Sequence, residues 1–324
     1  MPSEAMNDDP DESFVIDTIL RHRPQGRRSV SATGDLGLFQ AGDDAARTTE
    51  RDVVTVDAMV QGVHFRVEDR PEDIGWKLVA VNASDVAAMG CRPTWGVVTV
   101  SIPSPLDRDW ITGFARGLGE ALRFWEIHLV GGDTTGSPGP IALSMTLAGT
   151  GTRIVSRSGA NIGDVLWVTG ALGEAAAGFA DTNASGAGLL HRPRPPVRFG
   201  AALATIAGVT AMMDLSDGLG RDLARMCRAS QVSADIDPDS LPRGPSLLHA
   251  ADPLPAQVAF GEDYQLLFAA HPDARPAIEA RAAEHKVRVS VIGSVVAADG
   301  HPEARLRGRD WPAAGWSHFS TVRP

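Results

Sequence analysis

The sequence predicts a mixed α/β protein of two domains, and three observations point to this fold class. First, segments rich in β-branched residues alternate with segments of helical periodicity along most of the 324 residues. Second, this pattern breaks near residue 151, which predicts one domain over residues 12–150 and another over residues 151–324. Third, hydrophobic residues make up 43% of the chain, which is enough to form real cores. Residues 1–11 are acidic and contain proline, so we expect them to form a disordered tail.

The elements of the first domain follow from the spacing of its apolar residues. Alternating β-branched residues predict strands, and an apolar stripe with spacings of three and four residues predicts a helix. One predicted strand is expected to end in a tight turn at Gly131-Gly132. In chain order we expect a strand at 53–58, a helix at 73–89, a strand at 127–130 and a strand at 141–150.

The second domain shows the same alternation. Residues 181–198 are rich in glycine, proline and small polar residues, which predicts an exposed loop. Asp217 is expected to cap the helix that follows it, because an Asp side chain accepts hydrogen bonds from the free N–H groups of a first turn. The other expected elements are strands at 165–168, 211–214, 264–268 and 287–291 and a helix around 173–180.

The charge and the cysteines exclude several classes of function. Forty acidic residues against 30 basic ones give a formal net charge of −10, which argues against binding to nucleic acid or to an anionic membrane. Cys91 and Cys227 form neither a CxxC pair nor a disulfide framework. No basic and apolar leader opens the sequence, and no apolar run approaches the roughly 20 residues that span a bilayer. We therefore expect a cytoplasmic protein.

Several aspartates occupy positions where a surface charge is not expected. Asp85 shares a predicted helical stripe with Leu78 and Val81, and Asp57 lies within a β-branched strand. Each has an ordinary alternative, such as an ion pair for Asp85, a turn for Asp133 or a helix cap for Asp217. Taken together, and without His/Cys clusters, they favour a hard cation such as Mg²⁺. The set is Asp43, Asp44, Asp57, Asp85, Asp133, Asp214 and Asp217.

A phosphate-binding function would have to use unusual donors in this sequence. Neither a P-loop GxxxxGK[ST] nor a GxGxxG after a strand is present. The remaining donors are the amides at Gly131-Gly132, the helix start after Asp217, and arginines such as Arg157. Residue chemistry alone thus predicts a Mg²⁺-dependent, phosphate-handling α/β enzyme.

The same segments resemble the thiamine-monophosphate kinase family, within the aminoimidazole-ribonucleotide-synthetase-like superfamily. The resemblance covers about residues 12–319, and some of its motifs recur across the superfamily. Val63-His64-Phe65 and the terminal WxHF, together with RSGA and GEDY, favour the kinase. The motifs are GDDAA (42–46), TVDAMVQGVHF (55–65), WKLVAVNASDVAAMG (76–90), GGDTT (131–135), RSGANIGD (157–164), MDLSDGL (213–219), GEDYQLLF (261–268) and GWSHF (315–319).

The resemblance implies transfer of the γ-phosphoryl group of ATP to thiamine monophosphate, with several Mg²⁺ ions as cofactors and direct in-line transfer. It implies a two-domain synthetase-like fold in which the N-terminal sheets of two subunits pair into a homodimer barrel. ATP would be bound by Gly132, Asp133, Arg157 and Ser216, and the thiamine phosphate by His64, Glu262 and Trp316. Mg²⁺ would be bound by Asp44, Thr55, Val56, Asp57, Asp85, Asp133, Asp214 and Asp217.

Several positions depart from the family pattern, among them Gln40-Ala41, which replaces the usual Gly-x before the Gly-Asp-Asp turn. Val56 stands where Thr is common and can offer a metal only its backbone carbonyl, while Phe260 replaces a glycine and Asn161 a basic residue. No predicted carboxylate is lost, so we expect activity to be retained.

Two alternatives remain open. The first is another ATP-using enzyme of the superfamily, such as an aminoimidazole ribonucleotide synthetase. A selenophosphate synthetase is disfavoured, because residues 1–50 contain neither Cys nor Lys. The second is a non-catalytic nucleotide or metal sensor on the same fold.

Overall fold

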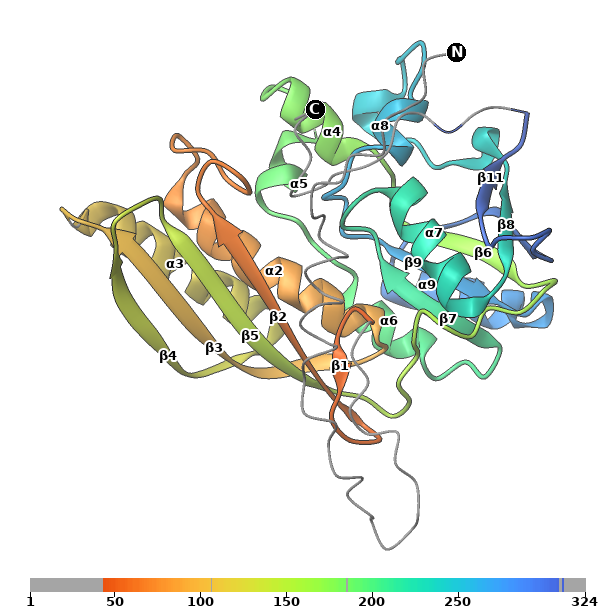
Figure 1. Cartoon of the computed structure of the whole chain (residues 1–324), viewed down its shortest axis with the longest axis horizontal. Coiled ribbons are helices and arrows are strands. Elements are labelled where there is room, and N and C mark those ends of the chain that lie inside the picture. The colour runs from red at the N-terminus through yellow and green to blue at the C-terminus, as the bar shows by residue number, and fades with distance from the viewer. Residues whose placement is uncertain (1–42, 106, 185, 309–310, 312–324) are drawn as a thin grey trace, which may run out of the picture.

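The protein consists of two α/β units that lie side by side (Figure 1). The computed structural model describes residues 43–105, 107–184, 186–308 and 311. The expected tail and Trp316 lie outside the described residues. The first unit carries a five-stranded sheet and the second a six-stranded sheet, so the predicted fold class of mixed α/β sheets is confirmed.

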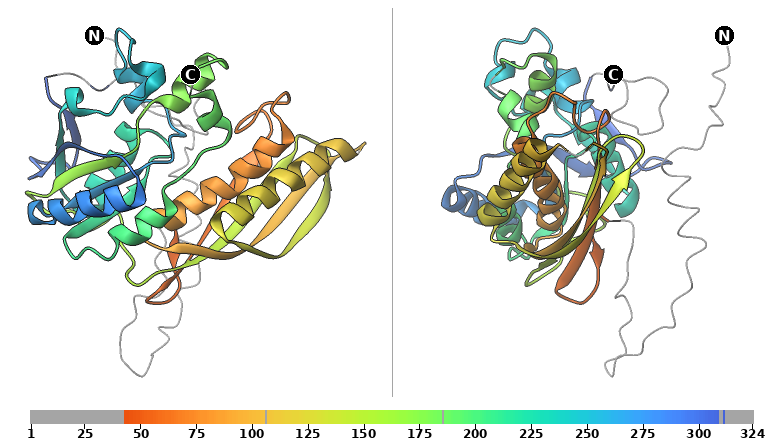
Figure 2. Two further views of the ribbon diagram at one scale, coloured as in Figure 1. Left: turned by 180° about the vertical axis from the view of Figure 1, so that it is seen from behind. Right: turned by 90° about the vertical axis from the view of Figure 1, so that its left-hand side faces the viewer.

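The first sheet has the order β1-β2-β5-β3-β4, with β3 and β4 parallel and the other pairs antiparallel. Helices α2 (Pro71–Ala88) and α3 (Arg108–Trp125) cover one face (Figure 2). The other face exposes apolar side chains, among them Val56, which is 62% exposed, and Ala58. The strands are β1 (Ala46–Arg47), β2 (Asp52–Val60), β3 (Arg92–Pro103), β4 (His128–Ser137) and β5 (Ala142–Thr150).

Strand β2 alternates as predicted. Val53, Thr55 and Met59 are buried toward the helices, whereas Val56 and Ala58 point to the exposed face. The pleat therefore turns the polar side chains of β2 inward, among apolar neighbours.

Helix α2 lies between the first sheet and the second unit. Pro71 begins it with a fixed φ, acidic residues occupy its first turn, and Gly90 with φ +72° ends it. Nearly every residue from Ile74 to Ala88 is buried, because the helix is covered on all sides. A helix in this position can present polar side chains to both units.

The second sheet has the order β11-β8-β10-β6-β9-β7, antiparallel except for β11 and β8. Its strands are β6 (Val165–Thr169), β7 (Val209–Asp214), β8 (Ser233–Ile236), β9 (Leu266–Ala270), β10 (Val289–Val296) and β11 (Ala304–Leu306). The helices are α4 (Glu174–Ala180), α5 (Ala187–His191), α6 (Val197–Leu203), α7 (Leu219–Ser230), α8 (Leu254–Val258) and α9 (Arg275–His285), with 3-10 turns at Pro238–Ser240, Pro245–Leu247 and Pro272–Ala274.

Two predictions about where turns and loops lie were wrong. Gly131-Gly132 makes no tight turn, because β4 continues through it to Ser137. A Cβ at position 132 would lie 2.2 Å from the Val98 carbonyl oxygen, so this glycine allows close approach of β3 rather than a turn.

The second wrong prediction concerns residues 181–198, which do not form an exposed loop. Helix α5 and the start of α6 fall within them, and Leu190 and Val197 are buried. Trp76 Nε1 on α2 donates a 2.9 Å hydrogen bond to the Pro193 carbonyl, which fixes the segment against the first unit. Among the described residues, no helix is long and apolar enough to cross a membrane.

Candidate active site

Carboxylates from both units meet beside α2. Asp85 on α2 accepts a 2.5 Å hydrogen bond from Thr55 Oγ1 on β2. Asp214, the last residue of β7, accepts a 2.6 Å bond from Ser84 Oγ. Asp44 lies close enough to raise the pKa of Asp85, and its backbone carbonyl accepts a bond from Thr55 Oγ1. The structure thus brings together acids that lie 170 residues apart in the sequence, from Asp44 to Asp214.

The electrostatics of this carboxylate cluster favour the binding of positive charge. Burial raises the pKa of Asp44 and Asp85 well above the ordinary range, and neighbouring carboxylates raise both further. Burial also raises the pKa of Asp214 to about 7. Such groups are costly to ionise together unless a cation is supplied.

Arg157 supplies part of that positive charge. Its guanidinium pairs with Asp43 at 3.2 Å and also with Asp44, and its backbone N–H donates to Asp43. Asp44 Oδ2, however, is buried with no hydrogen-bond partner. An unpartnered carboxylate oxygen among other acids is the donor type that a hard divalent cation uses, so the residues present fit Mg²⁺.

The predicted metal ligands do not form a closed coordination site. Within the described ranges, no three carboxylate, His or Cys groups lie close enough together to hold an ion. Asp57 lies near the cluster and raises the pKa of Asp85, and its backbone N–H donates to Asn82 Oδ1 at 3.1 Å. The Val56 side chain points to the opposite, exposed face, which leaves only its backbone carbonyl as a donor.

Asp217 does not cap α7, which corrects the sequence prediction. The N-cap residue is Gly218, with no side-chain cap hydrogen bond. The Asp217 carboxylate pairs instead with Arg225 Nη1 at 2.6 Å. Its backbone N–H donates to the buried Asp222 at 3.0 Å, so a second acid fixes the loop.

The loop that carries Ser216 is joined to the loop that carries Glu262. The Glu262 N–H donates to the Ser216 carbonyl at 2.8 Å, and the Tyr264 N–H donates to the Leu215 carbonyl at 2.9 Å. A Cβ at position 261 would lie 2.1 Å from the Ser216 carbonyl oxygen, so only glycine fits between the loops. The predicted ATP residue Ser216 and the predicted substrate residue Glu262 are therefore neighbours.

Glu262 and His64 are connected through Lys77. Lys77 Nζ lies 2.8 and 2.9 Å from the two carboxylate oxygens of Glu262 and donates to the His64 carbonyl at 3.3 Å. His64 Nδ1 accepts a 3.0 Å bond from the Val60 N–H, so the neutral ring carries its proton on Nε2. The two predicted substrate residues thus belong to one contact network.

Lys77, Asn82 and Ser84 also belong to the site, although the sequence prediction does not include them. Each contacts a predicted site residue, yet each lies on a helix whose other residues are mostly apolar. A signal was available, because polar residues on a helix that is otherwise buried need partners.

Gly132 and Asp133 lie away from the cluster. Both are exposed on the edge strand β4, and Gly132 shares a transverse row of the sheet with Val98, Met145 and Asp57. Gly132 and Asp57 lie at the two ends of that row, three strands apart. Neighbouring strands are spaced by about 4.8 Å, so these two residues are about 14 Å apart. A single chain does not bring these two residues to the other acids.

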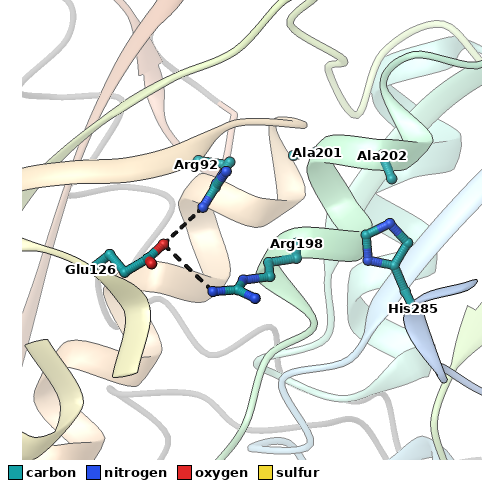
Figure 3. A pocket seen from close by; sticks show the side chains of 6 residues that line it. All are labelled: Arg92, Glu126, Arg198, Ala201, Ala202 and His285. Carbon is teal, nitrogen blue, oxygen red and sulfur yellow. Dashed lines mark hydrogen bonds and ion pairs between the residues drawn. The ribbon is translucent and has the colours of Figure 1, made fainter. Parts of the chain in front are cut away.

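Two cavities lie among the described residues, and the larger one is at the junction between the units. One of about 490 Å³ is lined by Arg92, Glu126, Arg198 and His285, and Figure 3 shows Glu126 pairing with both arginines. It contains none of the predicted site residues. A smaller one of about 170 Å³ is lined by Glu262 and by its neighbour Asp263, among other residues.

Comparisons with known proteins agree with the resemblance. The family described as AIR synthase related protein, N-terminal domain, matches residues 42–152, and the corresponding C-terminal domain family matches residues 161–303. The thiamine-monophosphate kinase of Haemophilus influenzae is 34% identical over 78% of this chain and 82% of its own. That of Escherichia coli K12 is 35% identical over 91% of this chain and 95% of its own.

Solved structures give the same result. A structure described as AaThiL complexed with AMPPCP and TMP is 28% identical, covers 95% of this chain and 97% of its own, and has a TM-score of 0.80. The thiamine-monophosphate kinase from Stenotrophomonas maltophilia is 34% identical, covers 91% and 96%, and has a TM-score of 0.74. The hydrogenase maturation protein HypE in complex with ATP, at 18% identity and a TM-score of 0.65, shares the fold. From these matches, the chain belongs to the thiamine-monophosphate kinase family.

Proposed function

We propose that this chain transfers the γ-phosphoryl group of ATP to thiamine monophosphate and so produces thiamine diphosphate. The observation that carries the proposal is the cluster of buried acids Asp44, Asp85 and Asp214, joined to Arg157 at the contact between the two units. Relatives of this chain are named as thiamine-monophosphate kinases, and one of them is described with AMPPCP and TMP bound. The acceptor phosphate is already anionic at neutral pH, so the reaction needs positioning and charge neutralisation more than a general base.

Mg²⁺ fits the acids of the site. When bound, it would neutralise phosphate oxygens and the developing charge of the transferred group. The orphaned Asp44 Oδ2 and the raised pKa values of Asp44, Asp85 and Asp214 support this assignment. The residues that would hold it are Asp44, Thr55, the Val56 carbonyl, Asp57, Asp85, Asp133, Asp214 and Asp217.

The remaining residues bind and orient the two substrates. Arg157 supplies a permanent positive charge for the phosphates of ATP, and Ser216 supplies a hydroxyl donor. His64 presents its Nε2 proton as a donor, and Glu262 offers acceptor oxygens to the thiamine moiety. Trp316 would contact the cationic thiazolium ring.

The position of Asp133 supports a homodimer. Gly132 and Asp133 are exposed on β4, Gly132 is about 14 Å from Asp57 within one chain, and the sheet exposes Val56 on its uncovered face. If two such sheets close edge to edge into the expected barrel, β4 of one subunit lies beside the free edge of β2 of the other, and Gly132 and Asp133 meet the acids of that subunit. Each N-terminal domain, over residues 12–150, would then serve both assembly and catalysis, and the C-terminal domain would begin near residue 151.

A turnover assay tests the proposal. Purified chain with Mg²⁺ and ATP is incubated in parallel with thiamine monophosphate, thiamine and aminoimidazole precursors. We expect thiamine diphosphate from thiamine monophosphate alone. ADP release without thiamine diphosphate would refute the substrate, and product from an aminoimidazole precursor would favour the other superfamily activity. Mg·ATP binding with no turnover on any substrate would favour a sensor.

A further inference from the structure

Two polar side chains on α2 reach acids of the second unit from the same side of the helix. Lys77 and Ser84 are seven residues apart, which is about two helical turns and places their side chains in line. Lys77 contacts Glu262, and Ser84 contacts Asp214. Glu262 belongs to the substrate end of the proposed site and Asp214 to the metal end.

The contacts of Lys77 use all three of its donors. The residue is 6% exposed, and Nζ has three acceptors, namely Glu262 Oε1, Glu262 Oε2 and the His64 carbonyl, at 2.8, 2.9 and 3.3 Å. Glu262 itself has a left-handed backbone with φ +69°, a conformation that a non-glycine residue keeps only when its surroundings hold it. Lys77 therefore restrains a carboxylate on a strained loop and a second loop that carries His64.

Ser84 acts in the same way at the other end. It is fully buried, and its hydroxyl donates a 2.6 Å hydrogen bond to one oxygen of Asp214. Asp214 is the last residue of β7, so its side chain projects where the strand ends. A hydrogen bond to one carboxylate oxygen fixes the rotamer and directs the other oxygen.

We propose that Lys77 and Ser84 are positioning residues that hold the carboxylates of Glu262 and Asp214 in a fixed orientation relative to each other. The Cα atoms of Lys77 and Ser84 are about 10 Å apart along the helix axis, because each residue of an α-helix rises 1.5 Å. The rigid buried helix thus contacts the carboxylate at the substrate end, Glu262, and the carboxylate at the phosphoryl-transfer end, Asp214, from two fixed points. This inference rests on the proposed function, since it assigns the two ends by their expected ligands.

The test compares Lys77→Met and Ser84→Ala with Lys286→Met, a matched control at the other, exposed lysine. For Lys77→Met we expect the KM for thiamine monophosphate to rise at least about tenfold, as for loss of a charged hydrogen-bond pair, with the KM for ATP within about twofold. For Ser84→Ala we expect the KM for thiamine monophosphate to stay within about twofold and the KM for ATP to rise. Several-fold more Mg²⁺ should be needed for half-maximal rate. Equilibrium dialysis of thiamine monophosphate and melting curves under Mg²⁺ titration should show the same division without turnover.

A double variant shows whether Lys77 acts through its partner. In the Glu262→Gln background, adding Lys77→Met should raise the KM for thiamine monophosphate by much less than tenfold. The proposal would be overturned if folded Lys77→Met protein showed equal changes, or no change, in the KM for thiamine monophosphate and the KM for ATP. If Lys77→Met fails to fold, Lys77→Gln, which keeps a donor, takes its place under the same criteria. Wild-type chain that makes no thiamine diphosphate would instead refute the proposed function.

Discussion

The Asp85 carboxylate on α2 accepts a 2.5 Å hydrogen bond from the Thr55 hydroxyl on β2. This bond joins the central helix to the first sheet at the carboxylate cluster. Thr55 also donates to the Asp44 carbonyl, so one hydroxyl orients two predicted metal ligands.

Asp85→Asn should reduce turnover at least about a thousandfold, because it removes a carboxylate that would bind the metal. The same change should stabilise the metal-free chain, since it removes a buried like charge while Asn still accepts from Thr55. Turnover and thermal melting in EDTA check the two effects. Asp273→Asn, at a surface position 92% exposed, is the control, and unchanged kinetics for Asp85→Asn would contradict the metal-site assignment.

Arg157→Gln should raise the KM for ATP about tenfold or more, because a charge-assisted contact to phosphate is lost. It should also destabilise the chain, since Asp43 and Asp44 lose their cation. Arg281→Gln removes a surface ion pair with Glu284 and should change neither property. Steady-state kinetics and urea unfolding measure both, and a normal KM for ATP in the Arg157 variant would exclude it from nucleotide binding.

Stability of the metal-free chain should fall as pH rises from about 5 to 7. Burial raises the pKa of Asp263 from 3.8 to about 7, against the opposing effect of N–H donors from Gly173 and Ala175. Because the folded state then holds a proton that the unfolded state has lost, the free energy of unfolding decreases up to the folded pKa and levels off above it. Each such group contributes a slope of at most about 1.4 kcal/mol per pH unit.

Urea unfolding in EDTA between pH 5 and 8 measures that slope. Asp263→Asn should make the slope shallower, because it removes one titrating group. Asp263 lies outside the carboxylate cluster, so the cluster itself is unchanged. A wild-type curve that rises over this interval would show that the buried acids are ionised in the folded chain.

Mixing two inactive variants tests whether subunits share a site. Asp57→Ala and Asp133→Ala should each be inactive as homodimers. If Asp133 acts in the partner's site, heterodimers contain one intact site, and a 1:1 mixture should recover about a quarter of wild-type activity. If differential tagging shows that heterodimers form but no activity is recovered, both residues belong to the same subunit's site.

The sequence predicted the acids of the site better than it predicted what holds them. Asp85 could be recognised because a charge on an apolar helical stripe needs a partner. Lys77 and Ser84 lie on the same helix, but the partner of Lys77 is 185 positions away and that of Ser84 is 130 positions away. Periodicity does not encode such a relationship. The resemblance to a known family supplied Glu262 and His64.

Local errors had local physical causes. Gly132 was taken for a turn residue, whereas a close approach of neighbouring strands requires it. Asp217 was expected to cap α7, but Arg225 and Asp222 engage its side chain and backbone instead. Residues 181–198 have the composition of a loop, yet packing against Trp76 orders the segment.

Strand β2 carries Thr55 and Asp57 toward the acids and Val54 and Val56 toward the exposed face, so neighbouring residues serve different partners. Inserting or deleting one residue here would exchange the two sets at once. Such a change would place carboxylates on the outer face and valines among the acids, and no substitution elsewhere would restore either. This segment should therefore tolerate replacement of side chains but never a change of length, and it would be a poor place for a tag, a loop graft or a circular-permutation break.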